Sequence, residues 1–117
     1  MPLLTSLLMT VATLAADGWC YESARVTAYV RSESGPLTAD GTPIWTDEPI
    51  AAASYDIPLQ SIVRIRDLGE FRIADRGGGL GNYAWIDVAV WTRAEAYALT
   101  SVREACISPP VGATYGR

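Results

Sequence analysis

The stretch SIVRIRDLGEFRIAD, Ser61 to Asp75, predicts a β-hairpin and with it the fold class. Apolar and charged residues alternate on both sides of the DLG turn, which is the pattern of two half-buried antiparallel strands. The apolar residues of one face are Val63, Ile65, Phe71 and Ile73. The charged residues of the other face are expected to be solvated. These are Arg64, Arg66, Glu70 and Arg72.

Further strands are expected on both sides of this hairpin. They are residues 24–30, 50–54, 84–91 and 101–107, which are short and rich in apolar or β-branched side chains. Residues 92–100, TRAEAYALT, predict a short helix, because Thr92 and Glu95 form an S/T-x-x-E capping box. Residues 31–49 collect Gly, Pro, Ser, Thr and Asp and predict a long surface loop. Together these features predict an all-β fold, a six-stranded barrel with one short helix after the fifth strand.

The charge and composition narrow the possible functions. The chain has 117 residues, a net charge of −4, nine basic residues that are all arginine, and no histidine. Scattered arginines in an acidic domain form no stripe that could follow phosphates, so nucleic acid is not an expected partner. The absence of histidine excludes Ser-His-Asp, Cys-His and zinc-hydrolase chemistry, and we expect neither a metal site nor a cofactor.

The N-terminal residues 1–16, MPLLTSLLMTVATLAA, are uncharged and largely apolar, as in a secretory signal peptide cleaved near Ala15 or Ala16. A buried N-terminal helix or strand is the alternative. The run is too short to cross a bilayer, which takes about 20 apolar residues, so no stable membrane insertion is expected. The expected organisation is a leader at 1–16, one barrel domain at 17–108 and a loose tail at 109–117.

Two cysteines lie near opposite ends of the expected domain. If the chain is exported to the periplasm, cell wall or extracellular space, Cys20 and Cys106 are expected to form a disulfide. In a cytoplasmic protein they would be two buried thiols.

Residues 73–88, IADRGGGLGNYAWIDV, place Asp75 and Asp87 on either side of a glycine-rich turn. Alternation puts Asp87 on the same face of its strand as Trp85 and Trp91, and a position between two indoles disfavours ionisation. The alternative for Asp87 is a buried structural acid bound by backbone amides. Asp75 is expected on the core-side face at the end of its strand, where it either holds the turn or assists Asp87.

Five short patterns occur in one order along the chain. They are VTAY (26–29), LTADG (37–41), IAAAS (50–54), IPLQSIVRI (57–65) and IADRGGGLGNYAWIDV (73–88). This set resembles the double-psi β-barrel group that contains the 3D domain, named for three aspartates, and the RlpA-like lytic transglycosylases. The resemblance covers Val26 to about Ile107 and implies a six-stranded double-psi β-barrel.

The resemblance also implies an activity on peptidoglycan. Lytic transglycosylases are lyases that cleave the MurNAc-GlcNAc bond without water and form a 1,6-anhydro product, for which one carboxylic acid suffices. The family's second and third aspartates match Asp75 and Asp87; the 3D-type members imply Asp87 as the catalytic acid, and the RlpA-like members imply that Asp75 is essential. The chain departs from the pattern at Ala53, where the first aspartate would stand, and at Gln60, where the family has glycine. The histidine that RlpA-like proteins carry near Ala53 is also missing.

Other candidate residues are expected to line a groove for the glycan strand. They are Tyr29, Asp40, Trp45, Arg76, Tyr83 and Trp85. Each aromatic residue could equally belong to the core, Tyr29 above all, and Arg76 is expected in a surface ion pair. Two other functions remain open: a non-catalytic glycan-binding module of the same fold, and a structural component of a phage or secretion assembly.

Overall fold

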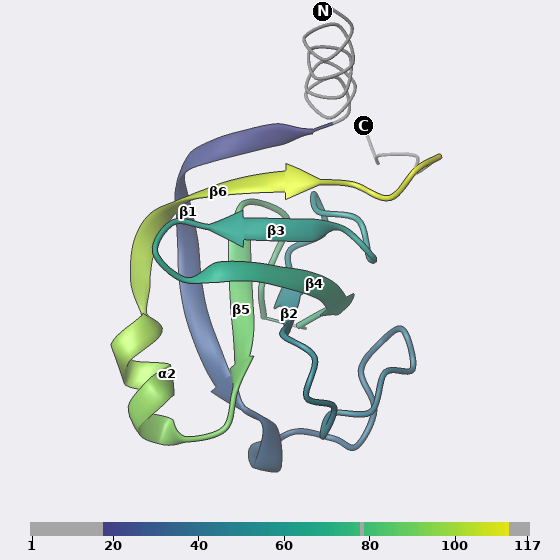
Figure 1. Ribbon diagram of the computed structural model, residues 1–117, viewed down its shortest axis with the longest axis vertical. Helices are drawn as coiled ribbons and strands as arrows, with labels where there is room; N and C mark the ends of the chain where they lie inside the picture. Colours follow the sequence, from purple (N-terminus) through teal and green to yellow (C-terminus); the bar gives the residue numbers. More distant parts are fainter. Residues whose placement is uncertain (1–17, 78, 113–117) are drawn as a thin grey trace, which may run out of the picture.

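The computed structural model describes residues 18–77 and 79–112 (Figure 1). Six strands close into a barrel in the order β1-β5-β2-β4-β3-β6, which confirms the predicted fold class. The β1-β5 and β2-β4 pairs are parallel, and the other four pairs are antiparallel. In chain order the elements are β1 (Trp19–Val30), a 3-10 turn η1 (Arg31–Glu33), β2 (Ile50–Ala53), β3 (Ile62–Ile65), β4 (Gly69–Asp75), β5 (Trp85–Val90), α2 (Arg93–Leu99) and β6 (Ser101–Ser108).

The long strand β1 pairs with two neighbouring strands. Its first part pairs with β6 as far as Val26, and its second part pairs with β5 from Arg25 onward. A register shift between Tyr21 and Ala24 interrupts the β1-β6 ladder, and such a bulge bends a strand. The bend is visible in Figure 1, where β1 curves around one side of the barrel. The strand begins earlier than the predicted one, and this extension carries one of the two cysteines.

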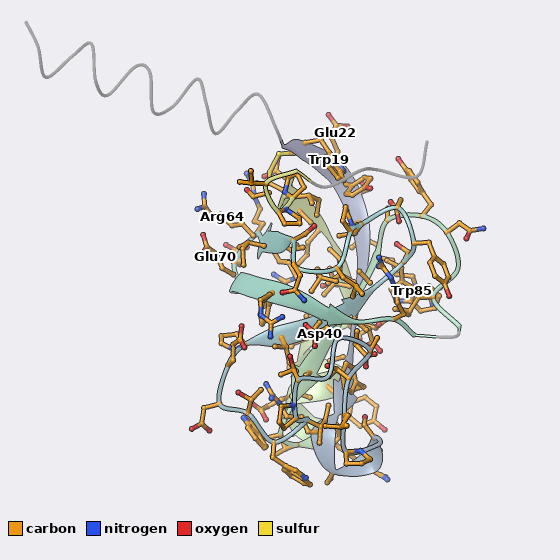
Figure 2. The ribbon with its side chains drawn as sticks, turned by 90° about the vertical axis from the view of Figure 1, so that its right-hand side faces the viewer. Trp19, Glu22, Asp40, Arg64, Glu70 and Trp85 are labelled. Carbon is orange, nitrogen blue, oxygen red and sulfur yellow. A yellow bond between two sulfur atoms is a disulfide. The ribbon has the colours of Figure 1, made fainter. Side chains whose placement is uncertain are left out.

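The predicted hairpin is confirmed as β3 and β4, with Val63 opposite Phe71 across the ladder. Its apolar face points into the barrel, where Val63 and Ile73 are fully buried. On the outer face Arg64 and Glu70 form an exposed ion pair at 2.6 Å, as predicted for a solvated surface. Figure 2 shows these two side chains together at one edge of the barrel.

Two apolar clusters stabilise the barrel. Aliphatic side chains from all six strands fill the interior; the largest that are fully buried include Ile65, Ile73, Ile86 and Ile107. A smaller cluster of Ile50, Ala74 and Ala89, with Tyr29 packed against it, lies on the outer face of β2, β4 and β5. The loop 34–49 lies against this outer face, since the backbone N–H of Asp40 donates to the carbonyl of Ala74 at 3.0 Å. The long loop therefore packs on the outside of the barrel where the candidate site lies.

The helix α2 begins at the predicted capping box. The Thr92 hydroxyl accepts from the Glu95 backbone N–H at 3.2 Å, and the Glu95 carboxylate accepts from the Thr92 N–H at 2.9 Å. Ala96 and Leu99 turn toward the barrel core and fix the helix against it. Within residues 18–77 and 79–112 no helix is long and apolar enough to cross a membrane.

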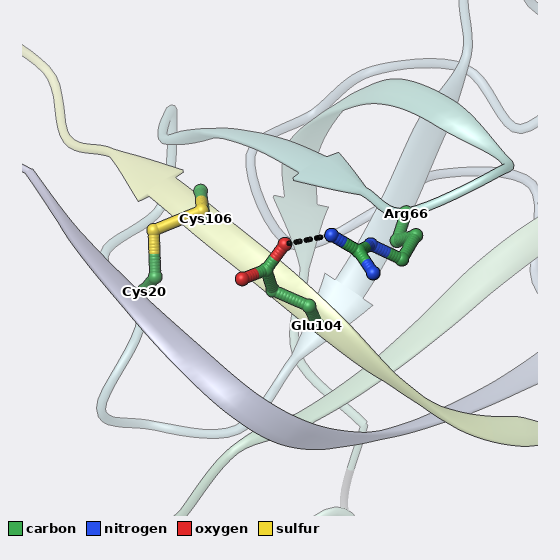
Figure 3. Close-up of a disulfide and its surroundings, with 4 residues drawn as sticks. All are labelled: Cys20, Arg66, Glu104 and Cys106. Carbon is green, nitrogen blue, oxygen red and sulfur yellow. Dashed lines mark ion pairs between the residues drawn. A yellow bond between two sulfur atoms is a disulfide. The ribbon is translucent and has the colours of Figure 1, made fainter.

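A disulfide between Cys20 and Cys106 joins β1 to β6, as predicted (Figure 3). The two cysteines are opposite each other in the antiparallel ladder. On the same strand Glu104 forms an ion pair with Arg66 at 3.4 Å. The expected leader, residues 1–16, lies outside the described residues, as does the end of the expected tail.

Candidate functional site

The candidate site is a row of residues across the outer face of four neighbouring strands. Thr27 of β1 is paired with Asp87 of β5, Asp87 with Ala52 of β2, and Ala52 with Asp75 of β4. Ala52, which lies between the two acids in this row, is buried and has a small side chain. The fold thus places Asp75 and Asp87 on one face with a single strand between them.

A β-bulge turns Asp75 toward this face. Ala51 is paired with Ile73, but Ala52 is paired with Asp75, so Ala74 is an extra residue in β4. One extra residue moves every later side chain to the opposite face of the sheet. The predicted core-side position of Asp75 is therefore wrong, because strict alternation from Ile73 makes no allowance for the bulge.

Asp75 binds the backbone of two connecting segments. Its Oδ1 accepts from the N–H of Ala39 at 2.9 Å and from the N–H of Arg76 at 2.8 Å. Ala39 belongs to the long loop, and Arg76 opens the glycine-rich turn. These are the contacts of an acid that holds connecting segments in place, which is one of the two roles considered for Asp75.

Asp87 is held through a side chain rather than through backbone amides. Its Oδ1 accepts from the Thr27 hydroxyl at 2.7 Å, and Thr27 Oγ1 accepts from the indole N–H of Trp85 at 2.8 Å. Among the described residues, no backbone amide donates to Asp87 and its Oδ2 has no hydrogen-bond partner. Thr27 is a site residue that the sequence analysis missed, because its contact with Asp87 depends on the parallel β1-β5 register.

The pKa of Asp87 is raised above its ordinary value. Burial is the main cause, and the negative charge of Asp75 adds to it, while the hydrogen bond from Thr27 acts in the opposite direction. The raised pKa increases the protonated fraction of Asp87 at any given pH. A carboxyl group of this kind can donate a proton and later accept one.

Tyr29 lies on the outer face next to these acids. It is opposite Ala89 in the β1-β5 ladder and packs in the outer apolar cluster, outside the barrel interior. Its hydroxyl is buried and has no partner among the described residues. Burial, followed by the charges of Asp75 and Asp87, raises its pKa, so the phenol is neutral near both acids.

Trp85 is fixed on two sides. Its indole N–H binds Thr27, and the guanidinium of Arg25 lies over its ring, 3.7 Å from the ring centroid. One face of the indole is therefore covered by a cation, which leaves at most the other face for a sugar. Arg25 is exposed and has no carboxylate partner among the described residues.

Arg76 does not form the predicted surface ion pair with any described residue. Its Nη1 donates to three backbone carbonyls, and its guanidinium lies 5.4 Å from the ring of Tyr55. The carbonyls are those of Ala53 (3.3 Å), Ser54 (2.9 Å) and Ile57 (2.5 Å). Arg76 is half-buried between the turn after β2 and the turn after β4, where these carbonyls replace a carboxylate as acceptors.

Asp40 belongs to a polar cluster around Arg72. The Arg72 guanidinium donates to Asp40 at 2.6 Å and to Glu48 at 2.5 Å, and only 20% of its side chain is exposed. The prediction that Arg72 lies on a solvated face is therefore wrong, because the long loop folds over it. Burial alone would raise the pKa of Asp40, but hydrogen bonds from Thr42 and Arg72 outweigh it and hold this pKa below its ordinary value. Figure 2 labels Asp40 near the middle of the molecule.

Gln60 joins the same cluster from a left-handed backbone conformation, with φ of 74°. Its side-chain Nε2 donates to Asp40 at 2.6 Å, and its Oε1 accepts from Arg72 at 3.1 Å. A residue with a Cβ in this conformation costs about 1 kcal/mol, which these two bonds offset.

Tyr83 contacts a different group of residues. Its exposed ring lies edge-on to that of Tyr21 with 5.4 Å between centroids. The Tyr21 hydroxyl donates to Asp56, which also accepts from the Ser54 hydroxyl at 2.5 Å and from the Ala84 N–H at 3.0 Å. Asp56 thus holds the turns around it, and none of these contacts joins Tyr83 to the acid row.

Trp45 and Trp91 form a stacked pair that the sequence analysis did not predict. Their ring centroids are 6.1 Å apart with 24° between the planes. Trp91 follows the end of β5 and contacts Trp45 and Arg31. Of the two indoles predicted on either side of Asp87, only that of Trp85 is linked to it, because the Trp85 N–H binds Thr27.

Comparisons with protein-family models, curated proteins and solved structures find no match to this chain. In the part of the chain that the structure describes, no group of three or more His, Cys, Asp or Glu side chains is placed to hold a metal ion. The candidate site therefore consists of the row of Thr27, Asp87 and Asp75 and the aromatic residues around it.

Proposed function

We propose that this protein is a peptidoglycan lytic transglycosylase that cleaves the MurNAc-GlcNAc bond and leaves a 1,6-anhydro product. The observation that carries the proposal is the state of Asp87. This outward-facing carboxyl has a raised pKa, one oxygen held by Thr27, and a second oxygen with no partner among the described residues.

The reaction needs one carboxyl group that acts first as a general acid and then as a general base. Asp87, protonated at the start, gives its proton to the glycosidic oxygen as the bond from the MurNAc C1 to that oxygen breaks. The resulting carboxylate takes the proton of the MurNAc O6 hydroxyl while O6 forms a bond to C1. Asp87 ends protonated again, and no water is consumed.

The neighbours of Asp87 have supporting roles in this mechanism. Thr27 orients the carboxyl through its hydroxyl, and Asp75 contributes a negative charge that keeps the pKa of Asp87 high. Tyr29 supplies a neutral phenol close to both acids. Asp75 also holds Ala39, so it positions the long loop beside the acid row.

One backbone feature supports the resemblance to the 3D and RlpA-like group, and the departure at Ala53 does not disturb the acid row. Gln60 has the left-handed conformation that favours glycine, and glycine is the family's residue at this position. Ala53, at the position of the family's first aspartate, packs into the barrel interior. Its replacement of an aspartate therefore removes nothing from the outward-facing row.

The proposed location is outside the cytoplasm, in the periplasm, cell wall or extracellular space. The disulfide between Cys20 and Cys106 supports export, because such bonds form and persist in oxidising compartments. The uncharged residues 1–16 add to this argument as a proposed leader.

Digestion of purified sacculi tests the activity. We expect the wild type to release 1,6-anhydro muropeptides, detected by mass spectrometry, and Asp87→Asn to reduce the rate by roughly a hundredfold or more. Asp67→Asn is the matched control, since Asp67 is an exposed acid on the β3-β4 turn, and it should release products at the wild-type rate. The absence of anhydro products from the wild type, or unchanged release by Asp87→Asn, would refute the proposal.

A glycan-binding module that does not cleave is the second candidate. The exposed pair of Trp45 and Trp91 favours it, as does the engagement of Asp75 by two backbone amides. Retention on insoluble peptidoglycan without soluble products would decide for this candidate.

A further inference from the structure

Two tryptophans are presented to solvent side by side. Trp45 is 59% exposed and Trp91 is 45% exposed, although the two stack on each other. Indole rings are usually largely buried, so an exposed pair of them indicates a binding surface. The stacking also brings together two residues from distant parts of the chain, the long loop and the end of β5.

Arg31 holds both halves of this pair. It is only 3% exposed, and its guanidinium lies 4.5 Å from the centroid of the Trp91 ring. Its Nη atoms donate to three carbonyls on both sides of Trp45. These are the carbonyls of Ile44 (3.1 Å), Thr46 (2.6 Å) and Glu48 (3.0 Å). The pair is therefore fixed before any ligand arrives, which reduces the entropy lost on binding.

The pair lies just beyond the C-terminal end of β5, the strand that carries Asp87. Trp91 is four residues beyond Asp87, a distance of about 13 Å along an extended chain. Between them on β5, Ala89 is buried in the outer apolar cluster, against which Tyr29 packs. A glycan strand that reaches both places would cross the surface of this cluster.

The chemistry of the pair favours an uncharged, flat ligand surface. The Arg31 guanidinium is buried and donates to backbone carbonyls, so it is not available to an anionic group. What remains exposed is the indole surface, which packs against flat apolar faces such as the C–H face of a pyranose ring. This chemistry and the distance from Asp87 together favour another ring of a long glycan strand as the ligand of the pair.

We infer that Trp45 and Trp91 form a distal sugar subsite, which stacks on a ring of the same glycan strand whose scissile bond lies at Asp87. The inference rests on the proposed function for the identity of the glycan. It predicts that longer glycans bind more tightly than short ones, because only they reach both places.

Calorimetric titration in the Asp87→Asn background, which prevents cleavage, tests the subsite. The probe is a purified glycan of six alternating GlcNAc and MurNAc rings. We expect Trp45→Ala and Trp91→Ala each to weaken its binding roughly tenfold, and Trp91→Phe, which keeps a ring, to restore part of the affinity. The control Tyr97→Ala removes an exposed aromatic residue of α2 and should change nothing.

The outcomes separate this inference from the proposed activity. If the Trp variants bind the glycan less tightly but the protein with Asp87 intact releases no anhydro product, the subsite is supported and the proposed cleavage is refuted. Product release together with unchanged six-ring affinity in both alanine variants would refute the subsite alone. Self-association that Trp91→Ala abolishes, without any glycan binding, would overturn the inference in favour of a second copy of this chain.

Discussion

Removing the Cys20-Cys106 disulfide should destabilise the barrel more than any single surface contact does. The bond joins the first strand to the last, and the cysteines are 86 residues apart in the sequence. For a loop of this length the chain-entropy treatment gives about 4.5 kcal/mol, and measured losses for native disulfides are about 2–5 kcal/mol. In a domain of this size such a loss lowers Tm by roughly 10–20 °C.

Urea unfolding followed by tryptophan fluorescence measures this effect. The oxidised wild type, the reduced wild type and the double variant Cys20→Ala/Cys106→Ala are compared, and the last two should agree. Arg66→Ala is the control near the bond; it removes an exposed ion pair with Glu104 and should cost less than about 1 kcal/mol. A loss below about 1 kcal/mol in the double variant would show that the β1-β6 ladder closes the barrel without the bond.

Other predictions concern the acids. Thr27→Val removes the hydrogen bond that lowers the pKa of Asp87, so this pKa should rise further in a carbon-13 NMR titration of the carboxyl; an unchanged or lower value would contradict the assigned contact. Asp40 has a lowered pKa, so its stabilising contribution exists above its unfolded pKa and disappears as the pH falls. Asp40→Asn should therefore reduce the free energy of unfolding at neutral pH but not in strong acid. The pKa of Asp87 is raised instead, so ionisation of Asp87 lowers the free energy of unfolding. Asp87→Asn should therefore stabilise the protein at neutral pH. Urea unfolding from acidic to neutral pH measures both differences, and a stabilising Asp40→Asn would refute the argument.

Local patterns in the sequence predict the local structure well. The hairpin of β3 and β4 follows from alternation around the DLG turn, and α2 follows from the capping box of Thr92 and Glu95. Both depend on residues a few positions apart, where periodicity and hydrogen-bonding chemistry act directly.

Contacts between distant residues escape the same treatment. Thr27 and Asp87 are 60 positions apart, and Arg72 and Asp40 are 32 apart, so neither pair leaves a periodic signal. Arg76 is a different case, because it selects backbone carbonyls, which every residue possesses and no sequence pattern reveals. Acid positions were therefore predictable as candidates, but their partners required the register of the barrel.

Because Ala74 is an extra residue, the face on which Asp75 lies depends on the number of residues in β4 as well as on their types. With strict alternation the same residues would turn Asp75 toward the barrel interior, where an unpaired carboxylate is strongly disfavoured, whereas deleting Ala74 would remove the bulge and leave Asp75 opposite Ala52 on the outer face. Substitution scans keep the number of residues constant and would not test this, but insertions and deletions between Ile73 and Asp75 would. In another barrel, an acid placed two residues after an inward-facing residue would share a face with Asp87 only if the bulge were copied as well.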